Sequence, residues 1–228
     1  DFEGNLDLLK KEYQSAVESG TELVVAPELA ITGYPPRDLL LKSGFIEGNL
    51  AALESLAEGI GKVGLIVGHV ARNESQTGRP MLNVVSLLQE GKVVATRAKS
   101  LLPTYDVFDE DRYFEPAADN RPVEYNGRSL GLTICEDVWN DDAFWKDRRY
   151  EANPVESLVE QGAQIIINVS ASPWSLGKER MRRDMLSSLA AKISRPAIYC
   201  NAVGGNDELV FDGGSLVLSE AGKVLGSG

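Results

Sequence analysis

The stretch Ser129-Leu130-Gly131-Leu132-Thr133-Ile134-Cys135-Glu136-Asp137-Val138-Trp139 is the most informative part of this chain. An apolar run leads directly into a thiol, two carboxylates and an aromatic side chain. A strand that only packs does not end this way. Nucleophiles on α/β scaffolds do, because the strand is rigid and the turn after it points the side chain into a cleft. The stretch predicts a buried strand over 129–134 and makes Cys135 a candidate nucleophile.

Two other apolar segments end in side chains that complement a thiol. The run from Val24 ends in the carboxylate of Glu28, and the run from Val93 ends in the amine of Lys99. A free thiol, with a pKa of about 8.5, holds little thiolate near neutral pH and needs a base or a cation beside it. Glu28 is suited to accept the thiol proton, and Lys99 to stabilise a thiolate and an oxyanion. We predict that the three side chains serve one site.

Each of these residues also has a structural interpretation, which the pattern alone leaves open. Most free cysteines are buried small hydrophobes. Glu28 would then be an ion-paired residue at a strand end, and Lys99 a solvated one. Cys200, within Ile198-Tyr199-Cys200-Asn201, is interpreted as a packed strand residue. The glycine pairs 204–205 and 213–214 lack the spacing of a phosphate-binding loop.

Composition excludes several classes of function. The chain has 228 residues, of which 43% are hydrophobic, enough for one well-filled domain. Its net charge of −11 argues against nucleic acid and anionic membrane surfaces as partners. It contains no apolar run near the ~20 residues of a membrane helix. Two cysteines do not make a disulfide framework and no secretory signal is visible, so we expect a cytoplasmic protein.

The chain contains one histidine, His69. A metal site built from several imidazoles is therefore excluded within one chain, and we expect no metal at this site. His69 ends an apolar run and is interpreted as a hydrogen-bonded strand residue. The activator of Cys135 must then be something other than histidine.

Helical and strand-like hydrophobic patterns alternate along the chain. Leu6, Leu9, Tyr13 and Val17 form an apolar stripe at helical spacing. Apolar runs without strict alternation favour buried strands in a layered α/β fold. We see no linker or repeat and predict one domain, with a turn at 221–225 toward a strand that does not follow. Helices are predicted over 5–19, 44–58, 153–161 and 178–194, and strands over 22–26, 63–70, 83–89, 92–97, 129–134, 165–169, 197–203 and 214–218.

Three blocks of this sequence resemble the nitrilase, or carbon–nitrogen hydrolase, superfamily. They run from Pro27 to Leu40, from Lys99 to Phe114, and from Cys135 to Trp139. Further motifs resemble one branch, the glutaminase domains of glutamine-dependent NAD synthetases. These motifs are Thr32-Gly33-Tyr34-Pro35-Pro36-Arg37-Asp38-Leu39, Ser170-Ala171-Ser172-Pro173 and the segment from Val203 to Ser215. Together the blocks cover nearly the whole chain.

The resemblance implies an α/β fold of four layers, the α-β-β-α sandwich of the nitrilase type. It implies that Cys135 attacks the side-chain amide of glutamine, with Glu28 as general base and Lys99 stabilising the tetrahedral intermediate. Glu110 matches a second glutamate close to this triad. The glutamine pocket would be lined by Tyr34, Tyr105, Glu136, Ser172 and Lys178. Lys178 stands where related enzymes have an arginine.

The resemblance also implies a place in a larger enzyme. Residues 1–228 would form the glutaminase domain. The family's first strand would precede Asp1 and a synthetase domain would follow residue 228, both outside this sequence. The synthetase domain would use the ammonia, with ATP and magnesium, to convert deamido-NAD to NAD. The glutaminase step itself would need no cofactor, and family members form oligomers by pairing their sandwiches.

Two other functions remain open at this level. The chain could be a stand-alone amidase of the same superfamily that acts on another amide. It could also be a non-catalytic scaffold that keeps the fold as a docking module. The presence of all of Glu28, Lys99 and Cys135 argues against the scaffold.

Overall fold

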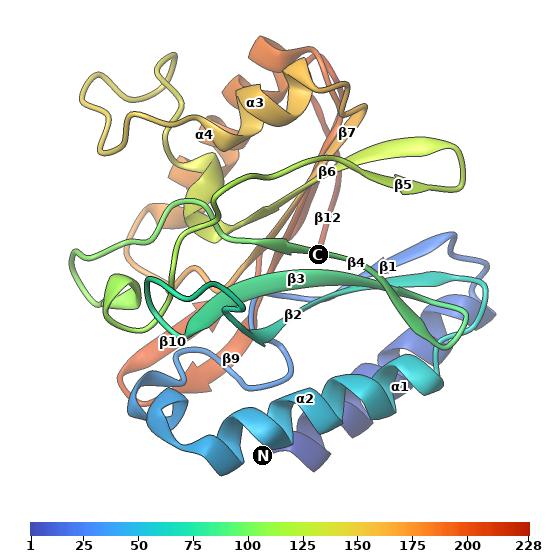
Figure 1. The fold of residues 1–228 in the computed structure, drawn as a ribbon. Helices are drawn as coiled ribbons and strands as arrows, with labels where there is room; N and C mark the ends of the chain where they lie inside the picture. Colours follow the sequence, from blue (N-terminus) through green and yellow to red (C-terminus); the bar gives the residue numbers. More distant parts are fainter. The chain divides into compact units, whose positions relative to one another are not determined.

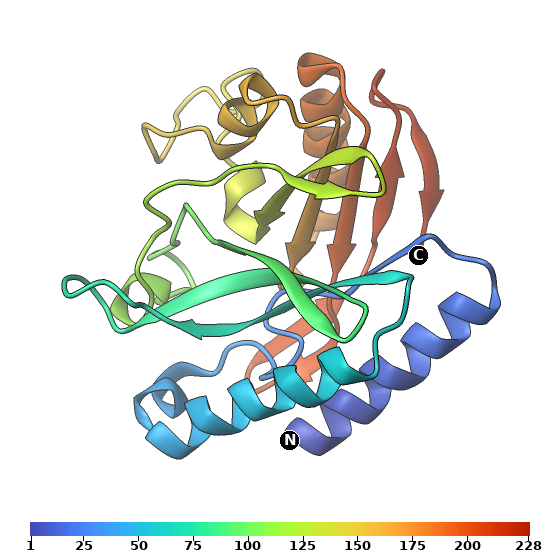
Figure 2. The ribbon, with the colours of Figure 1, turned by 45° about the vertical axis from the view of Figure 1, so that its right-hand side comes forward.

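The computed structural model describes residues 1–228, which divide into two compact units. The first unit comprises Asp1–Ala98 and Leu102–Pro116, and the second comprises Lys99–Leu101 and Ala117–Gly228. Each unit contains its own sheet, with two helices on it (Figures 1 and 2). Residues of the predicted site occur in both units.

The first unit has a four-stranded sheet in the order β1-β2-β3-β4. Strand β1 is parallel to β2, and the other pairs are antiparallel. Strands β3 and β4, which confirm the predicted strands over 83–89 and 92–97, form a hairpin, and φ values of +49° and +76° at Glu90 and Gly91 suit its two-residue turn. The elements are α1 (Phe2–Glu18), β1 (Leu23–Val25), η1 (Arg37–Leu41), α2 (Ser43–Glu58), β2 (Gly64–Arg72), β3 (Met81–Gln89), β4 (Lys92–Ala98) and η2 (Glu110–Arg112).

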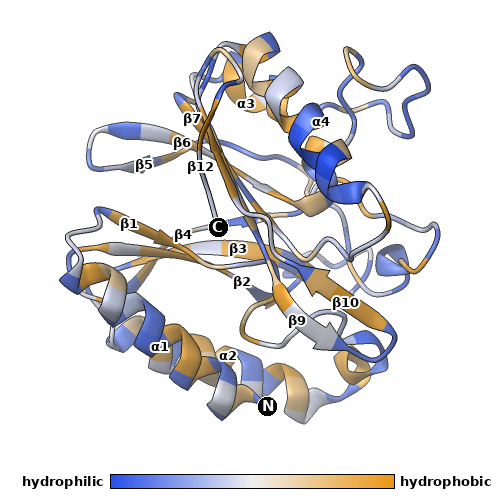
Figure 3. Cartoon of the chain, turned by 180° about the vertical axis from the view of Figure 1, so that it is seen from behind, coloured by the Kyte–Doolittle hydropathy of each residue, from blue (hydrophilic) through white to orange (hydrophobic).

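Helices α1 and α2 pack on one face of this sheet. The side chain of Asp1 caps α1 by accepting a hydrogen bond from the Gly4 amide at 2.9 Å. Figure 3 shows hydrophobic and hydrophilic residues side by side along both helices, as expected where one side of a helix is buried. The core between helices and sheet is formed by Leu6, Tyr13, Ala52, Leu53, Leu56, Ala57, Leu65, Val67 and Leu88, among others.

The second unit has a six-stranded sheet in the order β12-β11-β8-β7-β6-β5 and a separate hairpin of β9 and β10. Strands β6, β7 and β8 are parallel. Helices α3 and α4 pack on the sheet around a core that includes Leu158, Leu186 and Tyr199. The elements are β5 (Val123–Tyr125), β6 (Arg128–Ile134), η3 (Cys135–Val138), α3 (Pro154–Glu160), β7 (Ile165–Ser170), α4 (Lys178–Ile193), β8 (Ala197–Asn201), β9 (Val203–Asn206), β10 (Leu209–Asp212), β11 (Leu216–Leu218) and β12 (Val224–Ser227).

The predicted helices and longer strands are confirmed within a few residues. The prediction that no strand follows the turn at 221–225 was wrong, because Val224–Ser227 forms β12 and pairs with β11. The sequence did not predict β5, nor the hairpin of β9 and β10. No helix in the structure is long and apolar enough to cross a membrane.

The parallel strands β6, β7 and β8 determine where side chains gather in the second unit. Carboxyl ends of parallel strands lie at one edge of a sheet, where α/β proteins bind their ligands. Cys135 directly follows β6, Ser170 ends β7, and Asn201 ends β8. The candidate nucleophile therefore lies at the edge that this topology favours for a site.

Candidate active site

Cys135 is the first residue of the short 3₁₀ helix η3, directly after β6. Its φ of +41° is in the left-handed region, which costs a non-glycine residue about 1–3 kcal/mol. Its side chain is 5% exposed. Strained residues of this kind cluster at active sites, and a strand followed by a sharp turn is the geometry that presents nucleophiles on α/β scaffolds.

The carboxylate of Asp137 ties the Cys135 turn to the segment that carries Lys99. Its Oδ2 accepts the Ile134 amide at 2.9 Å, at the start of the turn. Its Oδ1 accepts the amides of Ser100 at 3.0 Å and Leu101 at 2.9 Å. Within the second unit, one buried side chain therefore binds the backbone directly before Cys135 and directly after Lys99.

Burial raises the pKa of Asp137 to about 7, against the opposing effects of these amides and of the Lys99 charge. Lys99 itself is fully buried, at 0% exposed. A buried ammonium is costly to desolvate and is usually kept for a paired or chemical role. The structure thus disagrees with the interpretation of Lys99 as a solvated strand-end lysine.

Asn168 on the neighbouring strand β7 supports the turn at Cys135. It lies in register with Thr133 on β6 and with Tyr199 on β8. Its Nδ2 donates to Thr133 Oγ1 at 3.1 Å and to the Cys135 carbonyl at 3.4 Å. Its Oδ1 accepts the Ser170 hydroxyl at 2.8 Å. The backbone of Cys135 is therefore held from the neighbouring strand.

Ser172 and Glu136 are both buried in the second unit. The Ser172 amide donates to Asn201 Oδ1 at 2.9 Å, and its carbonyl accepts from the guanidinium of Arg182 at 3.3 Å. Glu136 Oε1 accepts the Tyr150 hydroxyl at 3.1 Å. Both predicted pocket residues are therefore held by hydrogen bonds from segments distant in the sequence.

Lys178 begins α4 and is partly buried. Its Nζ lies 5.6 Å from the ring centroid of Trp139, the residue that directly follows η3. This is cation–π distance, so Lys178 lies close to the short helix that Cys135 begins.

In the first unit, a hydrogen-bonded group joins three predicted residues. Asn83 Nδ2 donates to Glu28 Oε1 at 2.8 Å and lies 3.5 Å from Glu110 Oε2. The Tyr34 hydroxyl donates to Glu110 Oε1 at 2.8 Å. All four side chains are buried. Glu28 and Glu110 thus share one amide donor.

Glu28 lies in a turn that begins three residues after β1, and Gly68 on β2 allows this turn to pass close to the sheet. The Gly68 amide donates to the Pro27 carbonyl at 3.2 Å. A Cβ at residue 68 would lie 2.6 Å from the Pro27 carbonyl oxygen and 2.7 Å from Glu28 Cα, and would also meet the Leu29 nitrogen. Only glycine fits between these backbone atoms.

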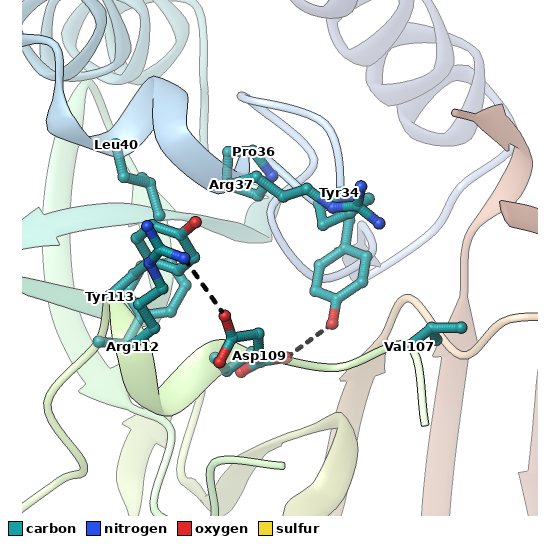
Figure 4. A pocket seen from close by; sticks show the side chains of 11 residues that line it. Tyr34, Pro36, Arg37, Leu40, Val107, Asp109, Arg112 and Tyr113 are labelled. Carbon is teal, nitrogen blue, oxygen red and sulfur yellow. Dashed lines mark hydrogen bonds and ion pairs between the residues drawn. The ribbon is translucent and has the colours of Figure 1, made fainter. Parts of the chain in front are cut away.

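A pocket of about 280 Å³ adjoins this group in the first unit (Figure 4). Tyr34 and Glu110 line it together with two arginines, Arg37 and Arg112. Tyr105, the remaining predicted residue of this unit, is half-buried and packs edge-on to Phe108, with ring centroids 5.6 Å apart.

Two residues that the sequence assigned to structure are buried (His69) or partly buried (Cys200). His69 Nε2 lies 2.7 Å from Ser86 Oγ, and burial lowers the pKa of this histidine to about 4. Burial raises the pKa of the Cys200 thiol to about 11. Near neutral pH the imidazole of His69 is therefore neutral and the thiol of Cys200 is protonated, so neither pKa suits a catalytic role there.

Sequence reasoning missed Asn83, Asn168 and Tyr150 as members of these groups. Asn83 and Asn168 each interrupt an apolar run that forms a strand, and that interruption is the signal that could have revealed them. Tyr150 lies in a polar loop and carries no such signal.

The model of the carbon–nitrogen hydrolase family matches residues 1–228. Among curated proteins, a glutamine-dependent NAD(+) synthetase from Synechocystis is 44% identical over 211 residues. The match covers 91% of this chain and 38% of that protein. The chain therefore spans about two fifths of the length of this relative.

Two solved structures match all of this chain. A glutamine-dependent NAD+ synthetase from Acinetobacter baumannii has a TM-score of 0.89 at 29% identity, with 40% of that chain covered. An amidase from Nesterenkonia has a TM-score of 0.81 at 26% identity, with 80% covered, and carries a covalently added acetamide moiety at its active-site cysteine. These matches confirm the predicted α/β fold class of the nitrilase type.

Proposed function

Because this chain belongs to the carbon–nitrogen hydrolase family, we propose that it is the glutaminase part of a glutamine-dependent NAD synthetase. The observation that carries the proposal is the strained, buried thiol of Cys135 in one unit with the buried ammonium of Lys99, both positioned by Asp137. The name and 44% identity of the Synechocystis relative support glutamine as the substrate.

Cys135 is the nucleophile. Glu28 takes the proton from its thiol, and the sulfur attacks the side-chain carbonyl carbon of glutamine. The carbonyl oxygen becomes an oxyanion, which the Lys99 ammonium and the Glu136 amide stabilise. The carbon–nitrogen bond then breaks, the nitrogen takes a proton from Glu28 and leaves as ammonia, and a γ-glutamyl thioester remains on Cys135.

Water completes the cycle. Glu28 removes a proton from a water molecule as that molecule attacks the thioester carbonyl. The carbon–sulfur bond breaks, the sulfur regains its proton, and glutamate leaves. Glu110 assists Glu28 through the Asn83 amide that contacts both carboxylates. The glutaminase step needs neither metal nor cofactor.

Substrate recognition is assigned to five residues. Glu136 receives the α-ammonium group of glutamine, and Lys178 faces its α-carboxylate as a point charge, because lysine cannot form the bidentate fork of arginine. Tyr34, Tyr105 and Ser172 line the remainder of the pocket.

ATP and magnesium belong to the synthetase part, which uses the ammonia to amidate deamido-NAD. No residue of this chain is assigned to them. One cluster of carboxylates, Asp141, Asp142 and Glu156, is close enough for a cation. The Lys192 ammonium already contacts all three, at 2.7 Å from Asp141 and 2.6 Å from Glu156, so this cluster does not suit Mg²⁺.

We assign the protein to the cytoplasm and expect residues 1–228 to act as one domain of a homo-oligomer. Its partners are glutamine and the synthetase domain. We assign it no nucleic-acid or membrane partner, in keeping with its net charge of −11.

Replacing Gly68 with alanine is expected to lower the rate of ammonia release from glutamine by about 100-fold, the typical cost of a 1 Å displacement near the chemistry. The added Cβ would push the turn that carries Glu28 and would weaken its 2.8 Å bond to Asn83. Gly44→Ala is the matched control, because a Cβ there meets nothing within 4 Å. Near-normal turnover by Gly68→Ala would show that the position of Glu28 is not critical.

The second candidate function is a stand-alone amidase, which the match to the Nesterenkonia amidase favours. The chemistry would be the same and the pocket would differ. Ammonia release from glutamine should be compared with release from acetamide and propionamide at equal concentrations. We expect kcat/KM for glutamine to be higher by at least about 100-fold, because a site built for charged groups rejects analogues that lack them. The opposite preference would assign the chain to the amidases.

A further inference from the structure

The loop after η3 is fastened at both ends. At its start, Lys192 of α4 contacts Asp141, Asp142 and, on α3, Glu156. The other end of the loop is held by Asn140, which lies just before Asp141: its Nδ2 donates to the carbonyls of Tyr150 at 2.8 Å and Ala152 at 2.7 Å. These contacts hold the two ends of the loop, residues 141–152, close together after η3.

Asn140 also fixes the backbone of Tyr150 in both directions. Besides donating to the Tyr150 carbonyl, it accepts the Tyr150 amide at its Oδ1, at 3.3 Å. Asn140 is 2% exposed. A buried side chain that makes three hydrogen bonds to one loop fixes that loop's backbone, and here it holds the backbone that carries the Tyr150 ring.

The Tyr150 hydroxyl is bonded to Glu136 Oε1 at 3.1 Å. An ionised carboxylate only accepts, so the tyrosine is the donor. Burial and the nearby Glu136 charge raise the pKa of Tyr150, so the hydroxyl stays protonated near neutral pH. The bond restricts rotation of the Glu136 carboxylate, which is itself only 4% exposed.

We infer that Tyr150 is a specificity-determining residue, whose hydroxyl holds the Glu136 carboxylate in the orientation that receives the α-ammonium group of an amino-acid amide. This rests on the proposed function, in which Glu136 binds that group. A carboxylate held in this orientation forms an ion pair with a substrate that has an ammonium group and forms none with a substrate that lacks one. Tyr150 thereby selects amino-acid amides over simple carboxylic-acid amides.

The test compares glutamine with glutaramate, which is glutamine without its α-amino group. Tyr150→Phe keeps the ring and removes the hydroxyl. We expect KM for glutamine to rise about tenfold, the lower range for a lost hydrogen bond to a charged group, with kcat within about twofold. The inhibition constant of glutaramate should stay within about twofold, because glutaramate does not use Glu136.

Tyr13→Phe is the matched control. Its hydroxyl donates to the Val63 carbonyl at 2.7 Å and accepts the Gly61 amide at 3.0 Å, so it tests loss of a structural hydrogen bond. It should lower Tm without changing KM. If Tyr150→Phe weakens glutamine and glutaramate equally, or weakens neither, the inference is wrong. If the wild-type protein releases no ammonia from glutamine, the proposed function fails first, and the inference with it.

Discussion

Replacing Cys135 with alanine is expected to abolish ammonia release from glutamine, by at least about 10³-fold, because the thioester can no longer form. No other thiol in the chain can substitute. Cys200 lies on β8, and burial raises the pKa of its thiol to about 11. The measurement is the initial rate of glutamate and ammonia formation. Cys200→Ala is the matched control and should keep near-normal turnover.

The same variant tests the proposed division of labour in the longer protein. Synthesis of NAD from deamido-NAD and added ammonia should remain intact in Cys135→Ala, since that reaction is assigned to the synthetase part. Cys135→Ala and Cys200→Ala should each retain the wild-type Tm within a few degrees, because the side-chain change is small. Loss of ammonia-driven synthesis in a folded Cys135→Ala protein would contradict the proposed assignment.

Lys99→Arg is expected to be nearly as damaging as Lys99→Ala, with each lowering kcat/KM by about 10²–10³-fold, the usual effect of removing an oxyanion donor. Lys99 is fully buried, and the amides of the two residues after it are held by Asp137. A planar guanidinium is larger than an ammonium and cannot place one compact charge in the same space. Charge alone therefore does not restore function.

The control is Lys92→Arg, at the exposed start of the same strand that precedes Lys99. It should leave kcat/KM unchanged. Recovery of most of the wild-type activity by Lys99→Arg would mean that only a positive charge is required, and the proposed close approach of Lys99 to the oxyanion would have to be abandoned.

The elements with strong hydrophobic periodicity were predictable, and the short ones were not. Helix α4 and strands β2 and β3 were located within a few residues. The strand β9 was missed because all four of its residues are exposed and two are glycines, so neither burial nor propensity marks it. A two-stranded hairpin of this kind depends on its pairing partner, which local patterns do not reveal.

The candidate site shows the same division. That Cys135 and Lys99 directly follow strands was predictable, and the structure adds that both are buried. Asn83 was not assigned to the site, because its partner Glu28 is 55 residues away and the two meet only after folding. The loop residue Tyr150 contacts Glu136 while its backbone is hydrogen-bonded to Asn140. No local sequence pattern predicts such a contact.

The most direct test of the central claim is peptide mapping by mass spectrometry after incubation with a glutamine-like diazoketone that alkylates glutaminase thiols. We predict a single adduct on Cys135, prevented by excess glutamine, and none on Cys200, whose raised thiol pKa of about 11 leaves almost no thiolate. An adduct on Cys135 that glutamine does not prevent, or no adduct on a protein shown to be folded by its thermal unfolding transition, would contradict the account.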